Sequence, residues 1–455
     1  MPAMKTQITE STLLFISIAK WVFLATLAGL IVGFPIALFL KLLRASSDWA
    51  GRWEYSYFLL PAALFLSALL VKYLAPEAKG HGTEKVIEAV HRRAGRIPLA
   101  VIPVKLVATL ITLSLGGSAG KEGPCAQIGA GITSAFSGLF RFNEHDRKKL
   151  VICGISAGFA AVFGTPIAGA IFGVEVLFVG SILYEVLLPS FIAGITAYQV
   201  SSAMGITYFY KPISIMPVFS ETFMLKVMFA GVFCGLAAMI LIESLKYGEK
   251  RARLVQMWEP YKGLLGGSAL VVMALLASKR YLGLGLDVIE DTLLGAPARW
   301  YDFIMKSAFT AVTLSFGGSG GIITPIFFVG ATAGSIYAGF MGLDRATFAA
   351  IGMTALLAGA ANTPIAASIM AVELFGPVVA PYATVACVIS FLMTGNRSVY
   401  PSQVLSMVKS ESITVELGKE LQEMRSTHSP EQGGMAAFAV RFIQRVDDAV
   451  NRLRR

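Results

Sequence analysis

The sequence predicts an all-α protein that crosses a membrane many times. Of its 455 residues, 55% are hydrophobic and only 15% are charged, and the mean hydropathy is +0.69. Apolar runs recur from residue 11 to residue 395. This composition is typical of polytopic helical membrane proteins and excludes a soluble globular domain.

Eight apolar segments are clear candidates for membrane spans, at 13–44, 54–75, 98–116, 182–203, 222–244, 262–278, 301–316 and 378–394. Six more are shorter than a full span or are interrupted by Gly and Pro, at 123–140, 148–164, 166–178, 325–341, 347–361 and 364–375. Short, interrupted segments in corresponding positions of two halves indicate the binding site of a transporter. The first run contains Lys20 and no small-residue cleavage site, so we expect a retained helix rather than a signal peptide.

The net charge of +10 invites a nucleic-acid interpretation, but the basic residues are scattered. They lie at the predicted membrane edges, as at 91–93, 147–149 and 246–253. Positive-inside anchoring explains this distribution, and we expect no nucleic-acid partner. The segment 435–455 alternates apolar and basic residues at helical spacing, which predicts an amphipathic basic helix on the cytoplasmic membrane surface.

The cysteines and histidines form no reactive constellation in the sequence. The four cysteines lie apart within apolar segments, at Cys125, Cys153, Cys234 and Cys387. They lack metal-ligand spacing, so we expect small core residues, with neither disulfides nor zinc. The four histidines add no metal or nucleophile pattern. We therefore expect a protein that is not an enzyme and needs no cofactor.

The chain contains an internal repeat. The stretch SLGGSAGKEGP at 114–124 and the stretch SFGGSGGIITP at 315–325 are identical at six of eleven positions. Residues 153–177 and 351–375 share ten identities in twenty-five. Two homologous halves follow, at about 13–205 and 222–400. The sequence by itself leaves open whether they run parallel or inverted.

Each glycine-rich motif predicts a helix that starts inside the membrane. Proline suits the first helical turn, and the glycines leave backbone N–H groups uncovered. Such a helix start, at the positive end of the helix dipole, favours a small anion. Glycine-rich joins also permit close helix packing in lipid. Packing does not require a glutamate at a helix start, however, and the first motif carries Glu122 where the second carries Ile323.

These motifs resemble those of the CLC chloride channels and chloride/proton exchangers. The run Gly120-Lys121-Glu122-Gly123-Pro124 is similar to the family's Gly-Lys/Arg-Glu-Gly-Pro signature. Residues 321–325 resemble its Gly-x-Phe-x-Pro motif, with Ile323 in place of phenylalanine. Tyr400, in GNRSVYPSQ, resembles the tyrosine whose hydroxyl reaches the central anion.

The resemblance covers nearly the whole chain and has structural implications. It implies inverted halves, many tilted and interrupted helices, and a homodimer with a separate pore in each subunit. It also implies a multi-pass protein of a bacterial inner (plasma) membrane with a cytoplasmic C-terminus. We expect a CLC-like transmembrane domain over 1–400 and a short cytoplasmic tail over 401–455. That tail is too short for the cystathionine-synthase-type regulatory domains of larger relatives, so the resemblance is to the prokaryotic type.

The sequence departs from the family pattern at two places. The first motif, usually Gly-Ser-Gly-Ile-Pro, reads Gly-His-Gly-Thr-Glu over 80–84, so that His81 replaces the serine that donates to the central anion. The inner glutamate, which many exchangers use to pass protons to the cytoplasm, aligns with Val176. Glu175 is adjacent, but it recurs as Glu373 in the second half, which favours a structural role.

We therefore predict coupled chloride/proton antiport, with Glu122 as the proton-linked gate and no metal. Amides around Gly82, Gly123, Ile322 and Ile323 would bind the anion, and His81 and Tyr400 would complete the inner side of the site. The histidine could also stand in for the missing inner proton relay. A passive, proton-gated chloride channel is the alternative that Val176 favours. A fluoride/proton exchanger would fit the altered first motif, although such relatives usually replace the proline found here as Pro124.

Overall fold

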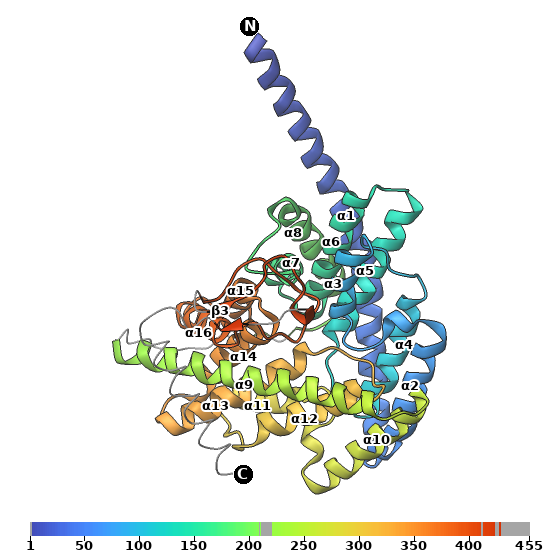
Figure 1. Ribbon diagram of the computed structural model, residues 1–455, viewed down its shortest axis with the longest axis vertical. Coiled ribbons are helices and arrows are strands. Elements are labelled where there is room, and N and C mark those ends of the chain that lie inside the picture. Colours follow the sequence, from blue (N-terminus) through green and yellow to red (C-terminus); the bar gives the residue numbers. More distant parts are fainter. Residues whose placement is uncertain (1, 209, 211–220, 411–412, 424–426, 429–455) are drawn as a thin grey trace.

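Helices account for nearly all of the ordered architecture, as the sequence predicts. The computed structural model describes residues 2–208, 210, 221–410, 413–423 and 427–428, with the side chains of α1 described from residue 9 (Figure 1). The first half contains α1 (Pro2–Gly51), α2 (Leu60–Leu74), α3 (Thr83–Arg92), α4 (Val101–Ser114), α5 (Glu122–Leu139), α6 (Glu144–Phe163), α7 (Pro166–Glu175) and α8 (Tyr184–Ala203). The second contains α9 (Glu221–Leu254), α10 (Glu259–Leu276), α11 (Leu286–Leu293), α12 (Asp302–Ser315), α13 (Ile323–Met341), α14 (Arg345–Ala361), α15 (Pro364–Phe375) and α16 (Ala380–Met393).

Short elements join these helices. Single 3-10 turns occupy Ser56–Leu59, Pro76–Ala78, Lys279–Tyr281 and Leu421–Glu423. Strand β1 (Phe178–Val179) pairs in parallel with β2 (Val404–Leu405), and β3 (Ile413–Thr414) pairs antiparallel with β4 (Thr427–His428). The β1–β2 pair ties the segment after α16 to the end of the α7 region.

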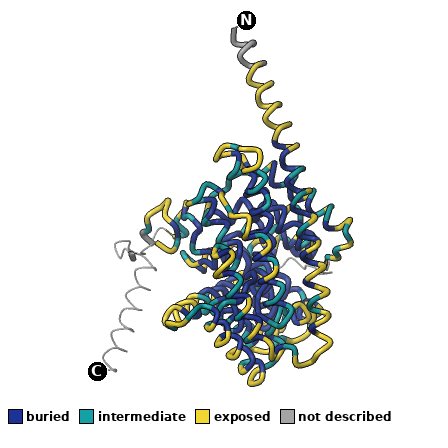
Figure 2. Tube along the Cα trace, turned by 90° about the vertical axis from the view of Figure 1, so that its right-hand side faces the viewer, coloured by how far each residue is buried: buried dark blue, intermediate teal, exposed yellow. Residues whose placement is uncertain are grey.

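Several helices have the length and composition of membrane spans. Within the described residues, five helical stretches meet this standard, at Thr9–Gly51, Ser56–Leu74, Tyr184–Ala203, Glu221–Leu254 and Ile323–Met341. Figure 2 shows buried chain in the middle of the molecule and exposed chain on the peripheral helices, including the outward end of α1. Large apolar side chains such as Leu13, Phe15 and Phe23 are exposed on α1. An apolar exterior of this kind fits a lipid surrounding.

The halves are inverted relative to one another, because corresponding helices run antiparallel. On α10, Gly267 lies beside Leu60 at the start of α2, whereas Gly263 lies beside Leu64 one turn further along α2. Residue numbers therefore rise along one helix as they fall along the other. The predicted inverted, all-α membrane fold is confirmed.

Helices α7 and α15 repeat this antiparallel arrangement through reciprocal hydrogen bonds. Glu175, at the end of α7, accepts from the N–H groups of Ile365 at 3.0 Å and Ala366 at 2.8 Å. Glu373, near the end of α15, accepts at the same two distances from the first turn of α7. Each carboxylate satisfies helix-start amides of the opposite half and complements its dipole.

Glycine pairs bring the backbones of neighbouring helices together at equivalent places in the two halves. A methyl group on Gly129 of α5 would overlap the carbonyl of Gly154 on α6. A methyl group on Gly330 of α13 would likewise overlap the carbonyl of Gly352 on α14. Small residues at such crossings let helices pack closely. In lipid, burial of apolar area gives little driving force for helix association, so close packing is needed.

The segment after α16 packs back onto the first half. Arg92, at the end of α3, donates to Glu420 at 2.5 and 2.8 Å and to Glu423 at 2.6 Å. Together with β1–β2, these contacts hold Val404–Leu405 and Glu420–Glu423 on the first half. The amphipathic helix predicted for 435–455 lies outside the described residues.

Replacing Glu175 by alanine should destabilise the protein, because it leaves two amides at the start of α15, including the buried amide of Ala366, without their carboxylate. The loss should be about 3 kcal/mol, the scale for charge-assisted hydrogen bonds, and should appear as a lower thermal unfolding midpoint in detergent. Glu54→Ala is the matched control, since Glu54 is exposed and pairs with Lys279 at the surface. Equal midpoints for the two variants would contradict a stabilising role for the hydrogen bonds between α7 and α15.

Candidate anion site

The two repeated motifs meet at the centre of the molecule. The Gly120 amide donates to the Gly321 carbonyl at 2.7 Å, and the Gly321 amide donates back to the Gly120 carbonyl at 2.5 Å. Helix α5 begins one residue after Lys121, and α13 begins at Ile323. This mutual pair therefore brings together the starts of two long helices, where uncovered amides and positive dipole ends converge.

Each motif is also held by a threonine of the opposite half. The Ser118 amide donates to Thr313 Oγ1 on α12 at 3.0 Å, and the Ser319 amide donates to Thr112 Oγ1 on α4 at 3.0 Å. All four residues are buried. Buried amides that are satisfied in this way hold an irregular backbone at membrane depth.

Two fully buried lysines fix the loops that lead into this region. Lys105 Nζ donates to the Gly80 carbonyl at 2.5 Å, and Lys306 Nζ donates to the Gly283 carbonyl at 2.8 Å. Gly80 immediately precedes His81, and the Lys105 charge acts electrostatically on the His81 ring. The loop before α3 is thereby anchored close to a positive charge, which favours anions nearby.

The carboxylate of Glu122 lies on the start of α13. Its Oε2 accepts from the Thr324 amide at 3.1 Å, and its Oε1 accepts from the Thr324 hydroxyl at 2.5 Å. The side chain is 1% exposed. A carboxylate from the first half therefore occupies a helix start of the second half, where a small anion would be expected to bind.

His81 and Gly82 bring a third helix start to the same place. His81 forms an isolated parallel bridge with Gly320, and Gly82 is the N-cap residue of α3. A methyl group on Gly82 would overlap the Gly123 carbonyl, so only glycine permits this approach. The Nδ1 atom of His81 is buried and has no hydrogen-bond partner among the described residues. Buried polar atoms are normally satisfied, so this atom is available to a ligand.

Tyr400 completes this group of buried polar atoms. Its ring centroid lies 6.0 Å from that of His81, and its side chain is 0% exposed. Glu84 and Glu122 act electrostatically on it, and the Thr83 side chain lies close to it. No hydrogen bond of good geometry reaches the hydroxyl from the part of the chain that the structure describes. Buried hydroxyls are normally satisfied, so this one is available to a ligand.

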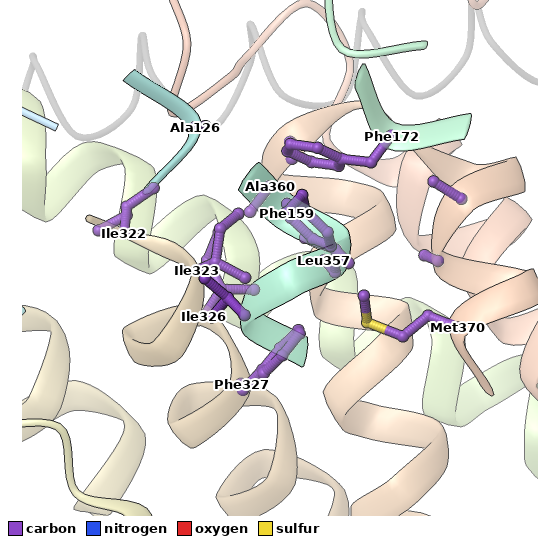
Figure 3. Close-up of a cluster of buried hydrophobic side chains, with 14 of the residues drawn as sticks. Ala126, Phe159, Phe172, Ile322, Ile323, Ile326, Phe327, Leu357, Ala360 and Met370 are labelled. Atoms are coloured by element: carbon purple, nitrogen blue, oxygen red, sulfur yellow. The ribbon is translucent and has the colours of Figure 1, made fainter. Parts of the chain in front are cut away.

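Ile322 and Ile323 can offer only their backbone. Figure 3 shows their side chains in an apolar cluster, with Ile323 close to Ile326 and Leu357. Both isoleucines are fully buried. Their amides belong to the cap and first turn of α13, where N–H groups have no partner within the helix. Amide donors in an apolar surrounding are the combination by which channels replace the hydration of an ion.

The structure separates Val176 from its acidic neighbour. Val176 is buried, and its carbonyl accepts from the side-chain amide of Gln403 at 2.9 Å. Glu175, by contrast, is bound to the start of α15. The position aligned with the inner glutamate therefore contacts the segment just after Tyr400, whereas Glu175 joins two helices.

Sequence reasoning did not identify every polar residue around the site. Thr324 lies within the quoted second motif, but its hydroxyl was assigned no role. Glu84 was noted only as part of an altered motif, and Ser402 and Gln403 were not singled out. The one feature of the sequence that points to Ser402 and Gln403 is their position shortly after Tyr400. Across the described residues, no group of three or more His, Cys, Asp or Glu side chains could hold a metal ion.

Comparison with known proteins identifies the family. The family model described as "Voltage gated chloride channel" matches residues 63–395. A chloride/fluoride channel protein of Pseudomonas syringae pv. tomato is 37% identical over 395 residues, which cover 85% of this chain and 86% of that protein. The crystal structure of a CLC-type fluoride/proton antiporter matches with a TM-score of 0.81 and 28% identity, over 86% of this chain and 99% of that one.

A slow cyanobacterial Cl⁻/H⁺ antiporter shares the fold, with a TM-score of 0.73 at 21% identity over 82% of this chain and 94% of that one. The motifs, the inverted halves and these matches agree. The chain belongs to the CLC family of membrane transporters, which carry chloride or fluoride.

Proposed function

We propose that this protein exchanges a halide for protons across the membrane, with Glu122 as the proton-linked gate. The observation that carries this proposal is the position of the Glu122 carboxylate on the first turn of α13. An ionised carboxylate and a halide compete for the same amide donors. Protonation weakens the hold of the carboxylate, so one site links halide entry to proton binding.

The geometry around Glu122 supports alternation between two occupants. The docked carboxylate accepts two hydrogen bonds from Thr324, and Tyr400 and His81 present polar atoms that have no partner in the described part of the chain. A neutral carboxylic acid would release the α13 start to a halide. The proton on Glu122 would then be carried as the halide moves in the opposite direction. The corresponding position, Ile323, cannot titrate, so the coupling resides in one half.

Chloride is the first candidate substrate, because Pro124 of the glutamate motif is intact. Fluoride is the second candidate. It is supported by the names of the 37%-identical relative and of the 28%-identical antiporter structure, and by His81 in place of the usual serine. A passive channel remains the alternative that Val176 favours. We further propose a homodimer in a bacterial inner membrane, with the C-terminus in the cytoplasm.

The direct test uses purified protein in liposomes with a halide gradient, no proton gradient and a clamped voltage. We expect halide flow to drive protons uphill in the native chain and no proton movement in Glu122→Gln, which keeps the side-chain shape but cannot titrate. Running chloride and fluoride in parallel identifies the substrate. Halide flux without proton movement at any pH would establish a channel instead. Potassium permeation would contradict an anion pathway.

Thr324→Val should favour the undocked state of Glu122, because it removes the hydroxyl that holds Oε1. A hydrogen bond to a charged group contributes about 1.5–3 kcal/mol, which corresponds to about a tenfold or larger change in an equilibrium constant. Halide binding, measured by titration calorimetry in detergent, should strengthen by about this factor. Thr324→Ser keeps the hydroxyl and should bind as the native chain does. Unchanged affinity in the valine variant would separate Thr324 from the gate.

His81→Ala should weaken halide binding by about tenfold, the scale of one hydrogen bond to an anion, because it removes a buried donor near Tyr400. His81→Ser restores a donor of the type usual in the family and should recover part of the affinity. Tyr400→Phe removes only the hydroxyl and should weaken binding similarly. Native affinity in His81→Ala would leave the histidine a packing role beside Gly320.

A further inference from the structure

We propose that Glu84 is the proton-transfer carboxylate on the inner side of Tyr400, in place of the glutamate that is absent at position 176. This inference rests on the proposed halide/proton exchange and adds the residue that brings protons to Glu122 from the side of the 400–423 segment. Glu84 occupies the place where the usual first motif has proline. A proline at that place could not carry a proton.

One of the two carboxylate oxygens of Glu84 accepts hydrogen bonds from the segment that follows Tyr400. Its Oε1 accepts from the Ser402 amide at 3.0 Å and from the Ser402 hydroxyl at 2.5 Å. Its Oε2 is buried and has no hydrogen-bond partner among the residues the structure describes. A carboxylate used only as an anchor would be expected to satisfy both oxygens. The free Oε2 is suited to gain and lose a proton.

One buried hydroxyl lies within the electrostatic reach of both Glu84 and Glu122. Both carboxylates act electrostatically on the Tyr400 hydroxyl, which is buried and without a partner in the described chain. His81, one turn before Glu84, adds a second unpartnered polar atom close to the Tyr400 ring. Among the described residues, Glu84, His81 and Tyr400 thus each carry a buried polar atom that has no hydrogen-bond partner. Polar and ionisable groups at such depth are costly and mark ion or proton pathways.

Val176, which aligns with the inner glutamate of the family, lies beside the same segment. Gln403 donates to the Val176 carbonyl at 2.9 Å, and its neighbour Ser402 donates to Glu84. The consecutive residues Ser402 and Gln403 thus connect Glu84 with Val176, the position that aligns with the family's inner glutamate. The carboxyl group has been relocated from the end of α7 to the start of α3.

The charges around Glu84 come from several elements. On α3, Lys85 pairs with Glu88 at 2.7 Å, and both act electrostatically on Glu84. On α4, Lys105 donates to the carbonyl of Gly80, which precedes Glu84 by four residues. Glu122 of α5 acts on the same tyrosine. The carboxylate therefore has both cations and anions nearby, and no ion pair to Glu84 occurs within the described residues.

The proton step needs no further reactant. A proton from water on the side of the 400–423 segment forms an O–H bond on Glu84 Oε2, which becomes a neutral carboxylic acid. That O–H bond breaks as the proton passes towards Tyr400, and an O–H bond forms on Glu122. Glu84 returns to the carboxylate and Glu122 becomes neutral. Charge and atoms balance over the cycle, and a halide takes the place that Glu122 leaves.

The test compares matched variants of the full chain in liposomes, with a chloride gradient and a pH-sensitive dye. In Glu84→Gln, we expect proton movement to fall to the level of protein-free vesicles while chloride flux persists. Glu88→Gln, a second carboxylate on the same helix, should couple as the native chain does. Ser402→Ala removes the hydroxyl bond but leaves the carboxylate, so it should retain proton movement. Adding Val176→Glu to Glu84→Gln should restore coupling.

The outcomes separate this inference from the function on which it depends. A native chain that moves no protons overturns both. A native chain that couples, together with a Glu84→Gln variant that couples equally well, overturns only the role of Glu84. If Glu84→Gln fails to fold, Glu84→Asp and Glu84→Asn replace it. If Glu84→Asp moves protons and Glu84→Asn does not, the relay role of Glu84 is supported. If both variants move protons equally, that role is excluded.

Discussion

The mutual hydrogen bonds between Gly120 and Gly321 are the constraint on which the rest of the structure depends. They bring two irregular loops together in the middle of a lipid-embedded fold, where unsatisfied backbone groups would be costly. Helices α5 and α13 start from this pair and diverge. The pair therefore determines where uncovered amides accumulate. The cross-half bonds from Ser118 and Ser319 extend the same constraint to α12 and α4.

Four charged side chains, an equivalent pair of lysines and an equivalent pair of glutamates, bind backbone groups, whereas the buried Asp302 and Glu420 pair with arginines. Lys105 and Lys306 donate to loop carbonyls, and Glu175 and Glu373 accept from helix-start amides. An isolated charge at this depth would be expensive, but preformed backbone dipoles replace much of its hydration. These groups occur in equivalent pairs because the fold is a repeat. They stabilise the scaffold in both halves without giving either half a distinct chemical role.

The chemistry is asymmetric although the scaffold is nearly symmetric. Only the first half places a carboxylate, Glu122, at the central crossing, and its counterpart is Ile323, whose side chain lies in an apolar cluster (Figure 3). Tyr400 and Ser402 come from the segment after α16, which is held by β1–β2 and by Arg92. That segment brings Tyr400 close to His81 and Ser402 into contact with Glu84. The repeat thus accounts for the shared scaffold, and one glutamate and one returning segment distinguish the first half from the second.

The sequence by itself determined the helical membrane fold, the two halves, the helix starts at Glu122 and Ile323, and the family, because apolar run lengths and glycine-proline punctuation are local signals. It could not decide the orientation of the halves, since identity between repeats carries no direction. The antiparallel contacts of α2 with α10 decided that. Nor could it pair Glu122 with Thr324, Glu84 with Ser402 or Val176 with Gln403. These partners lie roughly 200 or more residues apart, so only tertiary packing brings them within hydrogen-bonding distance.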